Sequence, residues 1–146
     1  MKRLRLKSNA GFTLVEIMLV IIIIIGLMAV LIPNLIGARD RANISTAGFA
    51  VERFKNDIIQ YESSNKRPPS TEQGLRALVE KPSGDPVPRQ WVQIETQLDD
   101  DPWGTPYQYE YPGKHNPKSF DIFSAGPDRI AGTEDDIGNW KTPQSK

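Results

Sequence analysis

Residues 11–36 read GFTLVEIMLVIIIIIGLMAVLIPNLI, and this stretch decides how the rest of the chain is organised. Its apolar run, 12–36, is about 25 residues long, and a helix needs about 20 to cross a bilayer. The preceding residues 1–11 read MKRLRLKSNAG and are basic. A secretory signal peptide has a shorter apolar region followed by a small-residue cleavage site, which this sequence lacks. We therefore expect a single transmembrane helix over 12–36, with the basic leader on the cytoplasmic side.

Glu16 is the only charged residue in this apolar run, one turn inside its start. A carboxylate at mid-membrane costs about 2.5–3.5 kcal/mol on insertion scales, and less near the interface. A plain signal-anchor helix, the simpler alternative, has no use for such a charge. If the chain were cut between Gly11 and Phe12, the new amine of Phe12 on a neighbouring copy would offer Glu16 a cation. We expect that pair to set the axial register between subunits.

The overall composition excludes several classes of function. Lys plus Arg and Asp plus Glu both number 18, so the net charge is zero and no basic surface for nucleic acid is indicated. The chain has no cysteine, which excludes thiol chemistry and cysteine-based metal sites. It has one histidine, His115, so most histidine-based metal and general-base sites are excluded as well. The apolar residues gather near the N-terminus, and the remainder is rich in proline and glycine. This asymmetry indicates an anchor that carries a loop-rich soluble head, 37–146.

A helical pattern continues beyond the apolar run. Apolar residues recur at three- and four-residue steps with charges between them: Ala47, Ala50, Val51, Phe54, Ile58 and Tyr61. The spacing predicts an amphipathic stem helix over 37–62 that ends near residues 63–65, before Pro68 and Pro69. We interpret the stripe as the core face of the head and not as a cofactor site.

The rest of the head is predicted as one short helix and two or three antiparallel strands. The helix begins at Ser70 as N-cap and reaches Val79. A turn at 101–106 precedes a strand at 107–111, which alternates aromatic and polar residues, and a second strand is predicted at 119–124. A long N-terminal helix with a small antiparallel sheet gives an α+β fold class.

The sequence contains no recognisable catalytic constellation. His115 lies in a Pro-Gly-Lys-His-Asn-Pro turn, where a surface position is expected. The run Asp99–Asp101 precedes a proline turn and is predicted to be solvated, with nothing nearby to separate the pKa values of its carboxyls. Trp103 and the tyrosines at 107, 109 and 111 are predicted to pack in the head. A membrane-anchored enzyme is therefore a hypothesis without a catalytic set.

Several segments resemble one protein family. Gly11 to Glu16 resembles the class III leader of type IV pilins and type II secretion pseudopilins. The blocks PSTEQGLRALVEKP, DPWGTPYQYEYPG and FDIFSAGPD…DDIGNW are similar to the type II secretion major pseudopilin, the general secretion pathway protein G family. The resemblance covers Gly11 to Trp140. The segment 90–100 and the loop after Asp128, which lacks doubled glycines, depart from the family pattern.

This resemblance implies how the chain is processed, where it lies and how it assembles. A prepilin peptidase would cut after Gly11 and methylate Phe12. The chain would sit in the inner membrane with its head in the periplasm, then polymerise with itself into a pseudopilus that drives export of folded proteins. Minor pseudopilins and an inner-membrane assembly platform would be its other partners. Gly26 and Pro33 would mark where the helix loosens in the filament.

A type IV pilus subunit for adhesion, motility or DNA uptake is the alternative function. Many such pilins close a C-terminal loop with two cysteines, and this chain has none. It ends instead in an aspartate-rich loop, which favours secretion.

The C-terminal loop is the candidate metal site. Residues 124–137 read SAGPDRIAGTEDDI, without the spacing of an EF-hand. Carboxylates and carbonyls on a glycine-bearing loop are the oxygen ligands that Ca²⁺ takes, but composition alone fits a solvated acidic loop equally well. The resemblance favours calcium and implies its ligands: the side chains of Asp128, Asp135 and Asp136 and the carbonyls of Ala125, Ile130 and Thr133. Glu134 is expected to face solvent.

Overall fold

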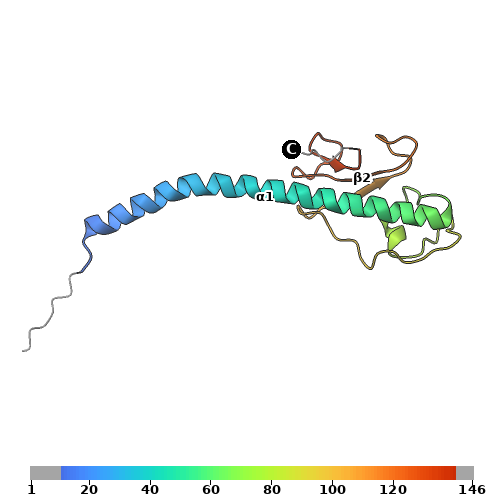
Figure 1. Ribbon diagram of the computed structural model, residues 1–146, viewed down its shortest axis with the longest axis horizontal. Coiled ribbons are helices and arrows are strands. Elements are labelled where there is room, and N and C mark those ends of the chain that lie inside the picture. The colour runs from blue at the N-terminus through green and yellow to red at the C-terminus, as the bar shows by residue number, and fades with distance from the viewer. Residues whose placement is uncertain (1–10, 141–146) are drawn as a thin grey trace, which may run out of the picture. The chain divides into compact units, whose positions relative to one another are not determined.

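A computed structural model describes residues 11–140, and for residues 30–36 it describes the backbone alone. Its largest element is helix α1, Leu14–Asn65 (Figure 1). The chain divides into two compact units between Arg39 and Asp40, and α1 contributes residues to both. The second unit corresponds to the predicted head, and "head" below means this unit.

One face of α1 supplies four of the ten buried side chains in the hydrophobic core cluster of the head. Its buried side chains follow the helical repeat: Ala47, Val51, Phe54, Ile58 and Tyr61. All of these except Ala47 pack in one cluster with side chains from the rest of the head: Leu75, Ala77, Leu78, Tyr109, Phe120 and Ile122. The predicted stripe is therefore confirmed as a core face. Truncating a fully buried side chain such as Phe54 to alanine would cost about 3–5 kcal/mol.

The residue that follows the C-terminal end of α1 caps the helix. Lys66 adopts a left-handed conformation with φ of 66° and donates its N–H to the carbonyl of Glu62, which satisfies one of the last helical carbonyls. Ser70 and Gln73 then exchange side-chain and backbone hydrogen bonds of 3.1 and 3.3 Å, a reciprocal capping arrangement. The regular element that follows is the short 3₁₀ helix η1, Leu75–Leu78, rather than a helix from Ser70 to Val79. Gly74, with φ of 56°, delays its start.

The sheet has three short antiparallel strands in the order β1-β2-β3. They are β1, Gln108–Glu110; β2, Asp121–Ser124; and β3, Ile137–Gly138. Tyr109 pairs with Ile122 and Ser124 with Ile137 across the two ladders. The Tyr109 hydroxyl donates to the carbonyl of Pro69 at 2.8 Å, so its buried polar end is satisfied. The predicted α+β architecture is confirmed.

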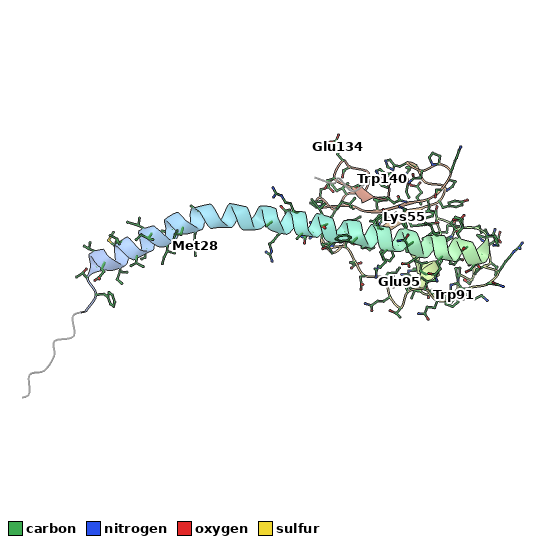
Figure 2. All side chains as sticks on the ribbon, in the orientation of Figure 1. Met28, Lys55, Trp91, Glu95, Glu134 and Trp140 are labelled. Carbon is green, nitrogen blue, oxygen red and sulfur yellow. The ribbon has the colours of Figure 1, made fainter. Side chains whose placement is uncertain are left out.

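The segment 90–100 runs along α1 in the opposite direction. The Gln90 N–H donates to Asn65 Oδ1 at 3.0 Å, and the Trp91 indole donates to the carbonyl of Ala77 at 2.8 Å. Farther along, Glu95 lies 3.3 Å from the guanidinium of Arg53. Trp91 and Glu95 lie on one side of α1, and Trp140 and Glu134 lie on the other (Figure 2). Helix α1 is therefore covered on two sides within the head.

Candidate assembly and metal sites

The predicted cleavage site precedes the first helix. Gly11 and Phe12 are exposed and non-helical, and α1 begins two residues later at Leu14. The Phe12 side chain is 81% exposed. The bond between Gly11 and Phe12 therefore lies in accessible backbone, which a peptidase requires. Cleavage and methylation at these residues stay predictions.

Glu16 has a local role that sequence reasoning missed. Thr13 and Glu16 form a capping box at the start of α1: the Glu16 N–H donates to Thr13 Oγ1 at 3.2 Å, and the Thr13 N–H donates to Glu16 Oε2 at 3.5 Å. The T-x-x-E spacing before an apolar run was the signal that could have revealed it. The carboxylate also lies at the positive end of the helix dipole. Its predicted pairing with the Phe12 amine of a neighbour remains untested by this arrangement.

The start of α1 exposes an unusual amount of apolar surface. Large side chains such as Leu14, Ile22 and Ile25 are more than 60% exposed. Among the residues whose side chains are described, no helix offers a stretch both long and apolar enough to cross a membrane. The predicted span 12–36 includes residues 30–36, whose side chains lie outside the description. The span therefore stays a prediction, as does the role of Pro33, where the backbone of α1 remains helical.

The aspartates of the C-terminal loop accept hydrogen bonds from the loop's own N–H and hydroxyl groups. Asp128 accepts from the Ile130 N–H at 2.8 Å, and Asp136, which is buried, accepts from the Gly132 N–H at 2.8 Å. Asp135 accepts from the Asp128 N–H at 3.2 Å and from the Thr133 hydroxyl. The bond from Thr133 is the main reason that the pKa of Asp135 lies below its ordinary value. The three predicted carboxylates thus lie on one loop, and each accepts a hydrogen bond from that loop.

Backbone geometry explains the glycines of this loop. Gly126 has φ of 68°, and a Cβ there would lie 2.6 Å from the carbonyl oxygen of Asp135. Gly132 has φ of 94°, a conformation that other residues rarely adopt. These two positions allow the chain to fold back so that Asp135 reaches Asp128. The loop therefore needs glycine at both turns.

The donor atoms suit calcium in kind, since they are carboxylate and carbonyl oxygens without nitrogen or sulfur. Of the predicted carbonyl ligands, that of Ile130 accepts from the Thr133 hydroxyl at 3.1 Å and that of Thr133 accepts from the Asp136 N–H at 3.4 Å. Ala125 is buried. Within residues 11–140, however, no three His, Cys, Asp or Glu side chains are close enough together to hold a metal. Glu134 is exposed and points away from the head (Figure 2).

A second, buried carboxylate organises the adjacent edge of the sheet. Asp121 is 1% exposed and accepts from the His115 N–H at 2.7 Å and from Asn116 through both its backbone and side-chain N–H groups. The His115 ring stacks on Trp140 with centroids 3.8 Å apart. Gly138 leaves room for that indole, because a Cβ there would lie 2.4 Å from it. His115 is thus exposed, as predicted, and its ring also stacks on Trp140.

Asp101 corrects part of the prediction for the acidic run. Asp99 and Asp100 are exposed as expected, but Asp101 is 5% exposed. It accepts from the N–H groups of Trp103 and Thr105, from the Thr105 hydroxyl and from the Ser124 hydroxyl. Burial alone would raise its pKa, but these hydrogen bonds outweigh burial and lower it. The proline turn folds this carboxylate inward to tie 101–105 to β2.

Comparisons with known proteins agree with this architecture. The family model for type II secretion system protein G matches residues 34–140. The type II secretion system core protein G of Pectobacterium carotovorum subsp. carotovorum is 47% identical, over 89% of this chain and 83% of the relative. That of Escherichia coli K12 is 40% identical, over 95% of this chain and 96% of the relative. The chain belongs to the type II secretion system protein G family.

A solved structure supports the same assignment. The crystal structure of the major pseudopilin from the type 2 secretion system of enterohaemorrhagic Escherichia coli is 43% identical, with a TM-score of 0.68. The match covers 77% of this chain and 97% of that chain. Membership of the protein G family confirms the resemblance found in the sequence and favours secretion over a type IV pilus. The roles of Gly11, Phe12, Glu16, Pro33 and the loop ligands remain predictions within it.

Proposed function

We propose that this chain is the major subunit of the periplasmic pseudopilus of a type II secretion system, which drives export of folded proteins across the outer membrane. One observation carries the proposal: the chain matches core protein G sequences over nine-tenths of its length. The fold is consistent with a structural role, because one face of α1 packs a small head built on a three-stranded sheet. The chain would act by polymerising, with no chemistry of its own.

The first unit suits assembly through a membrane-bound intermediate. Its exposed apolar side chains need lipid or a neighbouring helix as a partner. The basic leader 1–11 would remain cytoplasmic until a prepilin peptidase removes it and methylates Phe12. The head would then lie in the periplasm, ready to join copies of itself, minor pseudopilins and the inner-membrane assembly platform.

Calcium would stiffen the C-terminal loop of the head. Asp128, Asp135 and Asp136 would hold it with backbone carbonyls, and the ion would neutralise carboxylates that otherwise repel one another. The support is the donor chemistry and the position of all three carboxylates on one loop, where each accepts a backbone hydrogen bond. Binding to the folded loop alone would add to the stability of the head.

Genetic complementation tests the proposed function. The gene for this chain is deleted in its own bacterium, and secretion of folded exoproteins into the medium is measured beside assembly of sheared filaments. We expect secretion to stop and to return with the wild-type chain. Normal secretion with lost twitching or DNA uptake would instead identify a type IV pilus subunit.

A further inference from the structure

A groove lies between α1 and the end of the segment 90–100, where Asp99 and Asp100 lie. It has a volume of about 500 Å³, and Thr46, Phe49 and Tyr107 contribute to its walls. The Phe49 side chain is 75% exposed, although it lies inside the head on a helix with a well-packed core face. An exposed aromatic ring beside charged groups is typical of a contact surface.

The groove carries negative charge that forms no ion pair among the described residues of its own chain. Asp99 and Asp100 are both exposed, and Asp99 accepts a neutral amide hydrogen bond from Gln97 at 2.8 Å. Arg53 also lines the groove, but its guanidinium pairs with Glu95 at 3.3 Å. Among residues 11–140, no ion pair forms to either aspartate. A cation from another molecule would therefore be favoured here.

The other end of the segment 90–100, near the C-terminal end of α1, is basic. Lys66 and Arg67 follow the last turn of α1, and both are exposed. Arg89, also exposed, stands beside them because the Asn65 side chain holds the backbone of Gln90 at 3.0 Å. None of these three cations forms an ion pair within the described part of the head.

The two charged ends cannot meet within one chain. The segment 90–100 runs from Asn65 back to the groove beside Thr46, and 19 helical residues separate those positions, or about 28 Å at 1.5 Å per residue. Two copies displaced along the helix axis by that amount would bring unlike charges together. Such a contact joins two different surfaces, so it repeats into an open filament instead of closing into a dimer.

We propose that the Phe49–Asp99–Asp100 groove of one subunit receives the Lys66–Arg67–Arg89 end of another copy of this chain, at an axial offset of about 28 Å. This contact rests on the proposed function as a filament subunit. The arginines and the lysine supply the charge that the groove lacks. The stem of one of these side chains covers the Phe49 ring.

Charge reversal in the full chain, with the remaining secretion proteins present, tests the contact. Asp99→Lys with Asp100→Lys should lower the yield of sheared filaments at least tenfold without lowering the amount of subunit. Adding Lys66→Glu, Arg67→Glu and Arg89→Glu should restore a substantial part of the yield. Glu80→Lys with Asp85→Lys, an equal charge change at exposed sites away from the groove, is the control and should assemble normally. Equal yields from the Asp99/Asp100 variant and the wild type would overturn the proposal.

Thiol cross-linking tests it independently of charge and of the stability of those variants. The chain has no cysteine, so Arg89→Cys with Asp100→Cys introduces the only thiols. A disulfide needs Cα atoms within about 7 Å. Mild oxidation of filaments should give a ladder of dimers, trimers and longer species, whereas each single variant and an Asp85→Cys with Asp100→Cys control should not. Normal filaments without a ladder, or cross-links only to a different protein, would overturn the contact. If the wild-type chain forms no filaments at all, the proposed function itself fails.

Discussion

At the scale of single residues, Glu16 has two roles that can be separated. Within the chain it caps α1 together with Thr13. Between chains it is predicted to pair with the amine of Phe12. Glutamine at this position can still act in a capping box but carries no charge. The choice of substitution therefore distinguishes the two roles.

We predict that Glu16→Ala and Glu16→Gln both insert in the membrane, since each removes a costly charge. Both should reduce filament yield at least tenfold, measured in the sheared fraction and by secretion. Circular dichroism of the purified chain should show an intact helix start only for the glutamine variant. Normal assembly by Glu16→Gln with failure of Glu16→Ala would assign the residue to capping and not to pairing.

Asp101 shows how a buried carboxylate can stabilise the head. Asp101→Asn should lower the free energy of unfolding of the detergent-solubilised full chain by about 1–3 kcal/mol, because an amide group cannot accept all of the same hydrogen bonds. Asp100→Asn, its exposed neighbour, should change it by less than about 0.5 kcal/mol.

The pH dependence of this effect has a definite sign. The pKa of folded Asp101 lies below the ordinary 3.8, so its contribution is complete above that value and is lost as pH falls through the folded pKa. Wild type and Asp101→Asn should therefore differ most near neutral pH and converge in acid. A difference that grows in acid would contradict the assignment.

At the scale of elements, α1 and the segment 90–100 meet at a pair of like charges. Asp57 lies beside Glu95, and the buried oxygen Oδ2 of Asp57 finds no hydrogen-bond partner among the described residues. Burial, followed by the charge of Glu95 and a hydrogen bond to it, raises the pKa of Asp57 to about 6, while Arg53 opposes the rise. The pair holds the segment against α1 best when it shares a proton.

This pair should make the head less stable as pH rises. The folded pKa of Asp57 is raised above the ordinary 3.8, so its contribution is complete below that value and is lost as pH rises through about 6. Asp57→Asn should stabilise the protein at pH 8 by about 1 kcal/mol, a figure reduced for solvent screening, and by little at pH 4. Thermal unfolding of the full chain at both pH values measures this. Glu62→Gln on the same helix is the control; an equal response from both variants would contradict the pairing.

The C-terminal loop is the element whose stability should depend on metal. EDTA should lower the thermal midpoint of the full chain, and Ca²⁺ should restore it better than Mg²⁺, which prefers a smaller and more rigid site. At a hundredfold excess over Kd the gain would be about 2.7 kcal/mol. Asp128→Ala and Asp136→Ala should abolish the response, and Glu134→Gln should keep it. Identical melting of the wild type with Ca²⁺ and with EDTA would exclude the site.

At the scale of the whole molecule, the two units have surfaces of different character. The described part before Arg39 exposes large apolar side chains, whereas the head buries its apolar face against the sheet and η1. The exposed apolar side chains of the first unit need lipid or a neighbouring helix to cover them. Processing at Gly11 is expected to come before that assembly.

We predict that the mature chain begins at N-methyl-Phe12. Gly11→Val should leave the leader attached, because the peptidase needs a small residue before the scissile bond, and filaments should then be absent. Intact mass spectrometry of membrane-extracted protein reports both results. A mature wild-type chain that retains residues 1–11 would contradict the prediction, and Gly26→Ala is a matched control that should be processed normally.

The sequence by itself determined the features that follow from local order. The three- to four-residue repeat from Ala47 to Tyr61 determined the core face of α1. The alternation at 107–111 located β1, and the apolar segment at 119–124 located β2. These predictions succeeded because helix and strand periodicity are properties of consecutive residues. Family membership was also recoverable, since its motifs lie in short contiguous blocks.

Only the tertiary structure decided which polar groups are buried and where they find partners. Asp101 and Asp99 look alike in the sequence, yet Asp101 is enclosed by Ser124 from a distant strand, while Asp99 remains in solvent. The path of segment 90–100 along α1 was equally hidden, because it depends on Asn65 and Arg53, more than 20 residues away. Burial and charge pairing arise from contacts between distant segments, so no local pattern encodes them.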